Sequence, residues 1–354
     1  MRPQNLSSFR RKLLRWYDRH HRDLPWRRTR DPYAIWIAET MLQQTQVNTV
    51  TPYYERFLSA FPTVEALARA RLSKVLALWS GLGYYRRAAN LQKSAVVLVR
   101  EHAGRLPDNY ASLRALPGVG DYTAGALMSI AFGKSYPALD GNARRALGRI
   151  FEPKNEKELR NIAARLVPLS KPGYFNQGLM ELGATTCTPL KPRCAQCPVA
   201  SICATRTANA PLTRPDSTRQ NTFRDVTWPL AIVRHNGKIL LRRRAAHGIL
   251  AGLWELPGGE KTKSEPVHAL LSRHLGELKG AATREIPIGE IRHSITTRRI
   301  RAPILLFELH PNVKCRLNRS RWRWLSPFTL RRHAVSSMTL KAAKILSSYE
   351  KGSL

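Results

Sequence analysis

The chain has 354 residues, 43% of them apolar, which is enough for two domains with packed cores. Its formal net charge is +35, and residues 1–226 and 227–354 are both basic, unlike a neutral enzyme with a basic tail, which favours a nucleic-acid partner. Five cysteines, four of them clustered, argue against a secreted disulfide scaffold, and no apolar run could cross a membrane, so we expect an intracellular protein.

Helical spacing of apolar residues dominates the chain up to residue 205, which we predict to be one mainly α domain. A loop from Arg22 to Arg27 follows the first helix, and a short helix capped by Ser73 ends near Trp79. The longer predicted helices span 7–20, 34–58, 86–102, 109–115, 121–132, 142–150, 156–169 and 175–185, and one more starts at Pro62.

Two segments of this domain carry side chains suited to contact with bases. Residues 38–47 are rich in Gln and Thr, whose amides and hydroxyls a pocket or a nucleic-acid surface would use, although a solvated helix face is the simpler explanation. In Gly81-Leu82-Gly83-Tyr84-Tyr85, two glycines flank Leu82 and two tyrosines follow, which suits a wedge that stacks on bases. Aromatic residues that pack a turn are the ordinary alternative.

A glycine turn and an aspartate about twenty residues apart form the next pattern. Residues 116–120, LPGVG, lie between two predicted helices, and Gly118 and Gly120 permit a tight turn with positive φ. The free amides of the helix that starts near Asp121 suit a DNA phosphate. Taken singly, the glycines predict only a turn, and Asp140, just before another helix, predicts only an N-cap.

The most specific pattern in the chain is Cys187-x6-Cys194-x2-Cys197-x5-Cys203. Four thiolates suit tetrahedral zinc, but a zinc knuckle normally pairs close cysteines at both ends, and only Cys194 and Cys197 are close. A single compact loop with four thiolates fits a [4Fe-4S] cluster. Zinc remains the alternative.

The pattern changes after a polar segment, residues 206–226, which we predict to be a linker. Strand-like alternation follows on both sides of Asn236-Gly237, which predicts a hairpin. We therefore expect an α+β domain over residues 227–354. Its predicted strands are 228–233, 238–242 and 303–308, and its predicted helices are 269–278 and 339–349.

These patterns resemble the helix-hairpin-helix glycosylases of base excision repair, and over the whole chain they resemble the MutY family of adenine DNA glycosylases. The glycine turn with Asp140 is similar to the helix-hairpin-helix signature, and residues 38–46 are similar to the MutY catalytic helix. The cysteine spacing matches the iron–sulfur loop of the endonuclease III and MutY glycosylases at every interval. The resemblance implies a glycosylase domain over 1–205 with a [4Fe-4S] loop at 187–203, and a Nudix-like recognition domain over 227–354.

The resemblance also implies a role for each matching residue. Glu39 would be the general acid that protonates adenine, Asp140 the carboxylate that stabilises a cation-like sugar, and Tyr122 would lie beside that sugar. The adenine must first be flipped out of the base stack. The implied pocket and DNA contacts are Arg27, Gln44 (intercalating), Thr45, Leu82 (wedge), Tyr84 (stacking), Gly118, Gly120, Asn142, Glu181 and Thr296.

Position 122 bears on the reaction type. In the bifunctional relatives that cut the DNA strand, a lysine stands at this position and forms a Schiff base, which a tyrosine cannot do. The resemblance therefore implies a monofunctional glycosylase that acts on adenine opposite 8-oxoguanine or guanine. We expect it to act on double-stranded DNA as a monomer in the cytoplasm, with no membrane contact.

The C-terminal domain departs from the Nudix pattern G-x5-E-x7-R-E-x-x-E-E. His274 and Leu278 stand where two metal-binding glutamates should be. Because a magnesium site with one acid left from three is poor, we expect this domain to recognise DNA and not to hydrolyse a nucleotide. The positions that fit the pattern are Gly259, Glu265, Arg273 and Glu277.

A second departure lies in residues 291–299, where the MutY family usually has a Phe-Ser-His loop that senses 8-oxoguanine. The nearest match here is Ile295-Thr296-Thr297. Thr296 keeps a hydroxyl group, but Thr297 lacks the imidazole. We therefore expect the preference for 8-oxoguanine over guanine to be reduced.

Three other functions stay open. An endonuclease-III-like enzyme for damaged pyrimidines is disfavoured by Tyr122 and by the extra C-terminal domain. A Nudix pyrophosphatase with a DNA-binding partner domain is disfavoured by the broken Nudix pattern. A non-catalytic DNA-binding or redox protein is disfavoured by the intact pair of Glu39 and Asp140.

Overall fold

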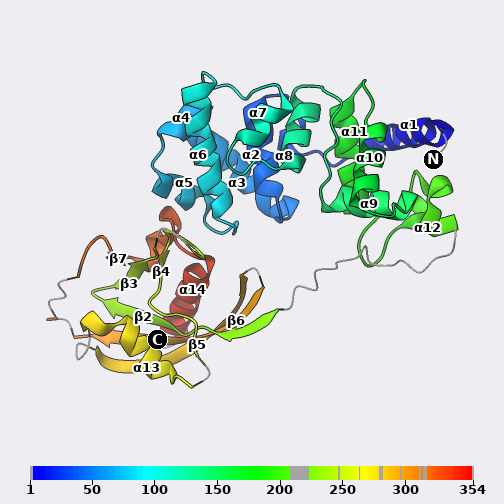
Figure 1. Ribbon diagram of the computed structural model, residues 1–354. Coiled ribbons are helices and arrows are strands. Elements are labelled where there is room, and N and C mark those ends of the chain that lie inside the picture. Colours follow the sequence, from blue (N-terminus) through cyan, green and yellow to red (C-terminus); the bar gives the residue numbers. More distant parts are fainter. Residues whose placement is uncertain are drawn as a thin grey trace. The chain divides into compact units, whose positions relative to one another are not determined.

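The computed structural model describes residues 3–207, 223–245, 248–262, 264–278, 282–295, 297–310, 312–313 and 317–352. The chain divides into two compact units, one of Met1–Arg69 with Asn90–Arg219 and one of Ala70–Ala89 with Gln220–Leu354 (Figure 1). The predicted combination of a mainly α part and an α+β part is confirmed. The predicted boundaries at 205 and 227 stay predictions, and residues 208–222 of the predicted linker lie outside the described residues. No described helix is long and apolar enough to span a membrane.

Helices make up almost all regular structure described in the first unit (Figure 1). In α1, Leu6, Phe9, Leu13 and Tyr17 repeat at helical spacing, and all four are buried. Phe9 and Leu13 pack with α9 and α11 residues such as Leu147 in one core cluster. The elements are α1 (Pro3–His20), η1 (Pro25–Arg27), α2 (Pro32–Leu42), α3 (Val47–Ala60), α4 (Val64–Arg69), α6 (Arg86–Glu101, which begins in the second unit), α7 (Tyr110–Ala115), α8 (Asp121–Ala126), η2 (Leu127–Ala131), α9 (Gly141–Phe151), α10 (Glu156–Leu166), α11 (Pro172–Glu181), η3 (Leu182–Thr186), η4 (Cys194–Gln196), η5 (Ala200–Ile202) and α12 (Ala204–Thr207).

The prediction of one continuous helix over 34–58 is wrong, because the structure has two helices there with a break between them. Helix α2 ends at Leu42 and α3 starts at Val47, because Gln44 adopts a left-handed conformation with φ +58 that cannot continue a helix. The polar residues between the two helices therefore form a loop. The predicted cap at Ser73 is also wrong, since Arg71 is the N-cap of that helix.

The second unit is built on a mixed sheet with the strand order β1-β6-β2-β3-β4, in which β5 pairs with β6 and β7 pairs with β3. The predicted hairpin is confirmed, because Asn236 and Gly237 both have positive φ and join β2 to β3. The elements are α5 (Leu72–Trp79), β1 (Arg224–Thr227), β2 (Leu230–His235), β3 (Lys238–Arg243), β4 (Trp254–Glu255), α13 (Val267–His274), η6 (Gly276–Leu278), β5 (Ala282–Ile295), β6 (Arg298–Leu309), β7 (Trp322–Leu325), η7 (Pro327–Arg332) and α14 (Ser337–Gly352).

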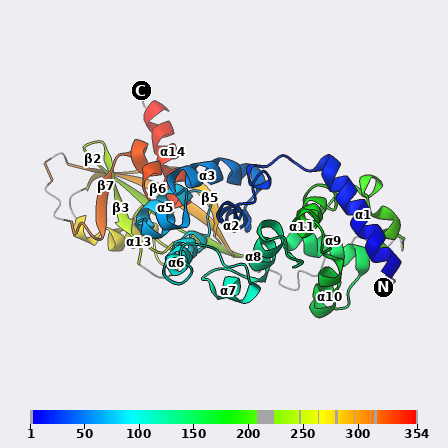
Figure 2. The same ribbon diagram turned by 90° about the horizontal axis from the view of Figure 1, so that it is seen from above.

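Helices α13 and α14 cover opposite faces of this sheet (Figures 1 and 2). Successive side chains of β2 point to opposite faces of the sheet, so each face has its own core. Ile232 packs in a core cluster with Met338 of α14, whereas Val233 packs in a different cluster with Leu270 of α13. The sequence predicts one strand over 303–308, but the structure has two longer strands, β5 and β6, which pair as a hairpin. Its pairing register shifts between Pro287 and Gly289, and this bulge interrupts the alternation that a strand prediction needs.

Candidate active site

A cleft of about 1020 Å³ in the first unit holds most of the predicted site residues. It lies among the loop after α2, the turn before α8, the start of α9 and the end of α11. Leu82 and Tyr84 belong to the second unit, and Thr296 lies outside the described residues. The predicted residues that line the cleft are Arg27, Glu39, Gln44, Thr45, Gly118, Gly120, Tyr122, Asp140, Asn142 and Glu181.

Glu39 lies in the second half of α2 and is buried, with 5% of its surface exposed. Burial raises the pKa of its carboxyl to about 7, the nearby charge of Asp140 raises it too, and a hydrogen bond from Tyr122 and the charge of Arg27 oppose the rise. A carboxyl with this pKa is partly protonated at neutral pH. Glu39 can therefore donate a proton to a bound group, as a general acid must.

Asp140 is the N-cap of α9, as its sequence position predicts. Its Oδ1 accepts a hydrogen bond of 2.7 Å from the backbone N–H of Ala143, and its Oδ2 accepts one of 3.0 Å from the side-chain amide of Asn142. Burial raises the pKa of Asp140, although these hydrogen bonds oppose the rise. Asp140 therefore both caps α9 and lines the cleft, and Asn142, which donates to it, lines the cleft as well.

Tyr122 lies in the first turn of α8, and its phenol donates a hydrogen bond to Oε2 of Glu39. Burial and the neighbouring carboxylates raise its pKa well above the usual value, so it stays a neutral donor. Of the two glycines before it, only Gly118 has positive φ, at +79, and a Cβ there would lie 2.7 Å from the side chain of Asn90. Gly120 has φ −92, so the expected positive φ is wrong for this residue.

The buried carboxylate of Glu181 anchors an ion-pair cluster at another wall of the cleft. Its carboxylate accepts hydrogen bonds of 2.7 Å from Nε of Arg22 and 2.8 Å from Nη2 of Arg27. Although burial opposes ionisation, these two guanidinium groups lower the pKa of Glu181 to about 2. Arg27 also lies over the ring of Tyr17, 5.4 Å from its centroid. The cluster is thus a rigid, permanently charged wall.

Arg22 and Arg145 line the cleft but were not predicted to do so. Nη2 of Arg145 donates a hydrogen bond of 2.8 Å to Oδ1 of Asn142, and its Nε donates one of 2.8 Å to the carbonyl of Cys187. Arg145 therefore connects the start of α9 to the start of the cysteine loop. A single arginine inside a helical pattern carries no sequence signal for such a role.

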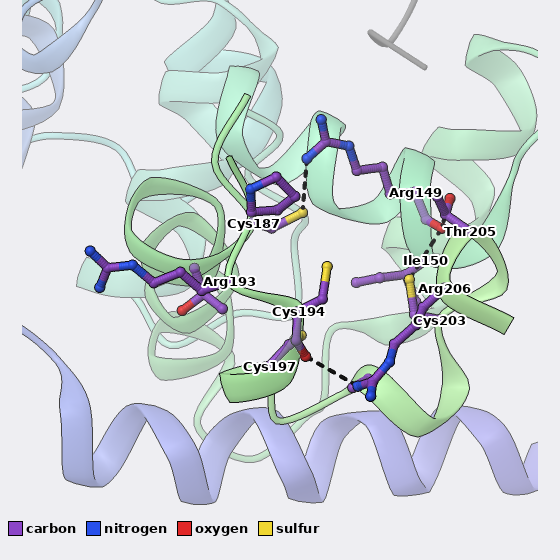
Figure 3. A pocket seen from close by; sticks show the side chains of 12 residues that line it. Arg149, Ile150, Cys187, Arg193, Cys194, Cys197, Cys203, Thr205 and Arg206 are labelled. Atoms are coloured by element: carbon purple, nitrogen blue, oxygen red, sulfur yellow. Dashed lines mark hydrogen bonds between the residues drawn. The ribbon is translucent and has the colours of Figure 1, made fainter. Parts of the chain in front are cut away.

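The four cysteines of residues 187–203 surround a separate cavity of about 200 Å³ (Figure 3). Among the residues that the structure describes, no three His, Cys, Asp or Glu side chains are grouped to hold a single metal ion. Four thiols around a space of this size fit a [4Fe-4S] cluster better than one zinc ion. Burial raises the pKa of the Cys197 thiol to about 11, so this cysteine would have to lose its proton in order to serve as a cluster ligand.

Arg149 supports this cavity from α9. Its Nη1 lies 3.5 Å from Sγ of Cys187 and donates a hydrogen bond of 2.8 Å to the carbonyl of Thr188. Its own carbonyl accepts a hydrogen bond of 2.7 Å from Thr205 (Figure 3). A guanidinium group beside the thiols stabilises thiolates and therefore suits the negatively charged ligands of a cluster.

The predicted wedge loop in the second unit is held by Arg87. Tyr84 has φ +47 and is 47% exposed, whereas Leu82 is buried. The guanidinium group of Arg87 lies 5.4 Å from the ring centroid of Trp79 and 5.5 Å from that of Tyr84, and it donates a hydrogen bond of 3.3 Å to the carbonyl of Gly83. Arg87 thereby fixes the backbone on which Tyr84 is displayed.

Three parts of the chain match known protein families. Residues 37–169 match the HhH-GPD superfamily of base excision DNA repair proteins, and residues 229–344 match the NUDIX domain. Residues 187–203 match the iron–sulfur binding domain of endonuclease III. The predicted [4Fe-4S] cofactor is thus confirmed at the level of the family, and Cys187, Cys194, Cys197 and Cys203 are the residues that would hold it.

Related proteins extend this similarity over the whole chain. The adenine DNA glycosylase of Homo sapiens is 34% identical over an alignment that covers 98% of this chain and 75% of the relative. That of Buchnera aphidicola subsp. Acyrthosiphon pisum is 36% identical, with 70% of this chain and 73% of the relative covered. A solved thermostable thymine-DNA glycosylase is 34% identical, with a TM-score of 0.55, and covers 58% of this chain and 98% of its own. An endonuclease III–DNA complex, at 22% identity and a TM-score of 0.52, shares the fold.

Proposed function

The chain belongs to the adenine DNA glycosylase (MutY) family of base excision repair, and we propose that it removes adenine mispaired with 8-oxoguanine or guanine in double-stranded DNA. The observation that supports this most is the pair of carboxyl groups in one cleft, Glu39 with a pKa of about 7 and Asp140 beside it. Adenine is a poor leaving group as an anion, so cleavage of its bond to the sugar needs a proton donor.

Each carboxyl group has one task in the proposed reaction. Glu39 gives its proton to the purine ring while the bond between adenine and C1′ breaks and its electron pair goes to the base. Asp140, ionised, stabilises the positive charge that develops on the sugar. A water molecule then adds its hydroxyl to C1′, and its remaining proton restores the acid. The phenol of Tyr122, which donates to Glu39, keeps that carboxyl in place beside the base.

The rest of the cleft would bind the flipped nucleotide. We propose that the charged wall of Arg27 and Glu181, together with Asn142, contacts the adenine edge. The turn at Gly118 and Gly120 would take a backbone phosphate, because these two residues carry no side chain that could block their own amides. Gln44 and Thr45, on the loop after α2, would contact the base stack. A net charge of +35 supports DNA as the partner.

We further propose that the enzyme is monofunctional and acts as a monomer inside the cell. Position 122 offers a phenol and no amine for a Schiff base, and every described residue that lines the cleft belongs to the first unit.

The test is base release from a labelled duplex that contains one adenine opposite 8-oxoguanine, compared with one opposite guanine. Strand breakage should appear only after alkali treatment. Breakage without alkali, trapped covalently by borohydride, would overturn the monofunctional part of the proposal. No base release from either duplex would overturn the whole.

A further inference from the structure

The second unit contains a cavity that the proposed reaction does not use. It measures about 510 Å³, and four arginines, Arg242, Arg243, Arg244 and Arg321, line it together with Glu255 and two small residues. Its lining thus carries a net positive charge. None of these lining residues is aromatic or large and apolar, so the cavity suits a small anion and not a base.

Strand pairing brings the arginines together at one end of β3. Arg242 lies opposite Glu255 of β4 and also opposite Trp322 of β7. The backbone N–H of Arg243 donates a hydrogen bond of 2.8 Å to the carbonyl of Arg321, just before β7. The sheet therefore fixes the backbone from which these arginines project, and the side chains of Arg243 and Arg321 are exposed.

Glu255 orders two of these arginines without cancelling the charge. Only 2% of its side chain is exposed, and it accepts hydrogen bonds of 3.1 Å from Nη2 of Arg242 and 2.8 Å from Nη1 of Arg244. One carboxylate thus holds two guanidinium groups, whose side chains are 18% and 21% exposed. Preordered guanidinium groups are the side chains best suited to phosphate oxygens.

The altered Nudix position lies next to this cluster. His274, which replaces a glutamate of the pattern, receives a hydrogen bond of 2.6 Å at Nδ1 from Nη1 of Arg242, since a guanidinium group can only donate. A Cβ on Gly259 would lie 2.8 Å from Nε2 of His274, so the imidazole packs against the glycine turn. Where a Nudix hydrolase needs a carboxylate for its metal, this chain has an imidazole that orients an arginine.

We propose that this cavity, which we call the arginine pocket, binds a phosphate group directly through its guanidinium groups and without a divalent metal. The phosphate can belong to the backbone of DNA or to a free nucleotide, because both present the same oxyanion. The site is independent of the glycosylase proposal, since none of its residues lines the cleft of the first unit.

The test uses the full-length protein in EDTA and the double variant Arg243→Gln/Arg321→Gln, whose two side chains are exposed. The matched control, Arg331→Gln/Arg332→Gln, removes the same charge from exposed residues of η7 outside the pocket. One measurement is the slope of log affinity for duplex DNA against log salt concentration. The other is calorimetric titration with inorganic pyrophosphate. Ala245→Glu, which adds a carboxylate to the lining, is a second variant that removes no arginine.

If the pocket takes a backbone phosphate, the double variant should lower the salt slope by about 0.9 relative to the control, the contribution of one phosphate contact. If it takes a free phosphate, pyrophosphate should bind the wild type and the control but neither pocket variant, with the DNA slope unchanged. The proposal is overturned if neither measurement separates the pocket variants from the control, or if phosphate binding appears only when Mg²⁺ is added.

Discussion

The phenol of Tyr122 donates a hydrogen bond to Oε2 of Glu39 in the cleft of the first unit. This bond stabilises the carboxylate form, so it lowers the pKa of Glu39, which burial raises to about 7. Tyr122 thereby links the turn before α8 to the proposed acid on α2. It also opposes the effect of burial and so lowers the pH at which that acid loses its proton.

We predict that the excision rate of the wild type falls as the pH rises above 7, because Glu39 then loses its proton. Tyr122→Phe removes a stabilising contact of the carboxylate, so the pKa of Glu39 should rise and the alkaline fall should move to higher pH. A hydrogen bond to a charged group contributes about 1.5–3 kcal/mol, which corresponds to a shift of roughly 1–2 pH units. Single-turnover rates measured across the pH range check this.

The control for this variant is Tyr110→Phe. The phenol of Tyr110 also donates to a carboxylate, that of Asp121 at 3.2 Å, but Tyr110 lies outside the cleft. Its pH profile should match the wild type. An alkaline fall that stays in place in Tyr122→Phe would show that Glu39 is not the group that titrates.

The purified protein should be yellow-brown and contain about four iron atoms per chain. Cys197→Ser should lose the iron, because Cys197 lines the cluster cavity. Cys315→Ser is the matched control and should keep iron and colour, since Cys315 lies outside the four-cysteine spacing. Zinc in place of iron after anaerobic purification would contradict the assignment.

How far the sequence predicts this site depends on the distance between partners along the chain. The cysteine loop, the glycine turn and Asp140 were found because each pattern is contained in a short segment. Arg22 was missed because its partner Glu181 lies 159 residues away, and only the tertiary fold brings the two together. The break at Gln44 was missed because apolar spacing does not report a left-handed backbone.

Arg87→Met should slow excision about tenfold. The variant keeps most of the apolar stem but loses the cation between Trp79 and Tyr84 and the hydrogen bond to Gly83. Together these contacts are worth roughly 1–2 kcal/mol, and their loss would free the loop that displays Tyr84. Arg86→Met, at the exposed neighbouring position, should behave like the wild type. Equal excision rates for the two variants would contradict the claim that Arg87 supports the reaction by holding the loop of Tyr84.

Thr296→Ala should narrow the rate difference between adenine opposite 8-oxoguanine and adenine opposite guanine. The reason is chemical: a hydroxyl at this position can bond to the oxidised base, and one lost hydrogen bond is worth roughly 0.5–1.5 kcal/mol. Single-turnover rates on the two duplexes check it. If a strong preference survives in Thr296→Ala, recognition lies elsewhere, and Tyr84 is the next residue to change.

The most direct measurement is the single-turnover rate of adenine release, opposite 8-oxoguanine, by Glu39→Gln. Glutamine keeps the shape of the side chain and can still contact Tyr122, but it has no proton to give. The account predicts that excision is lost while affinity for the duplex stays within about twofold of the wild type, and that Glu55→Gln, at an exposed position of α3, excises normally. Release by Glu39→Gln at a rate near that of the wild type would contradict the central claim.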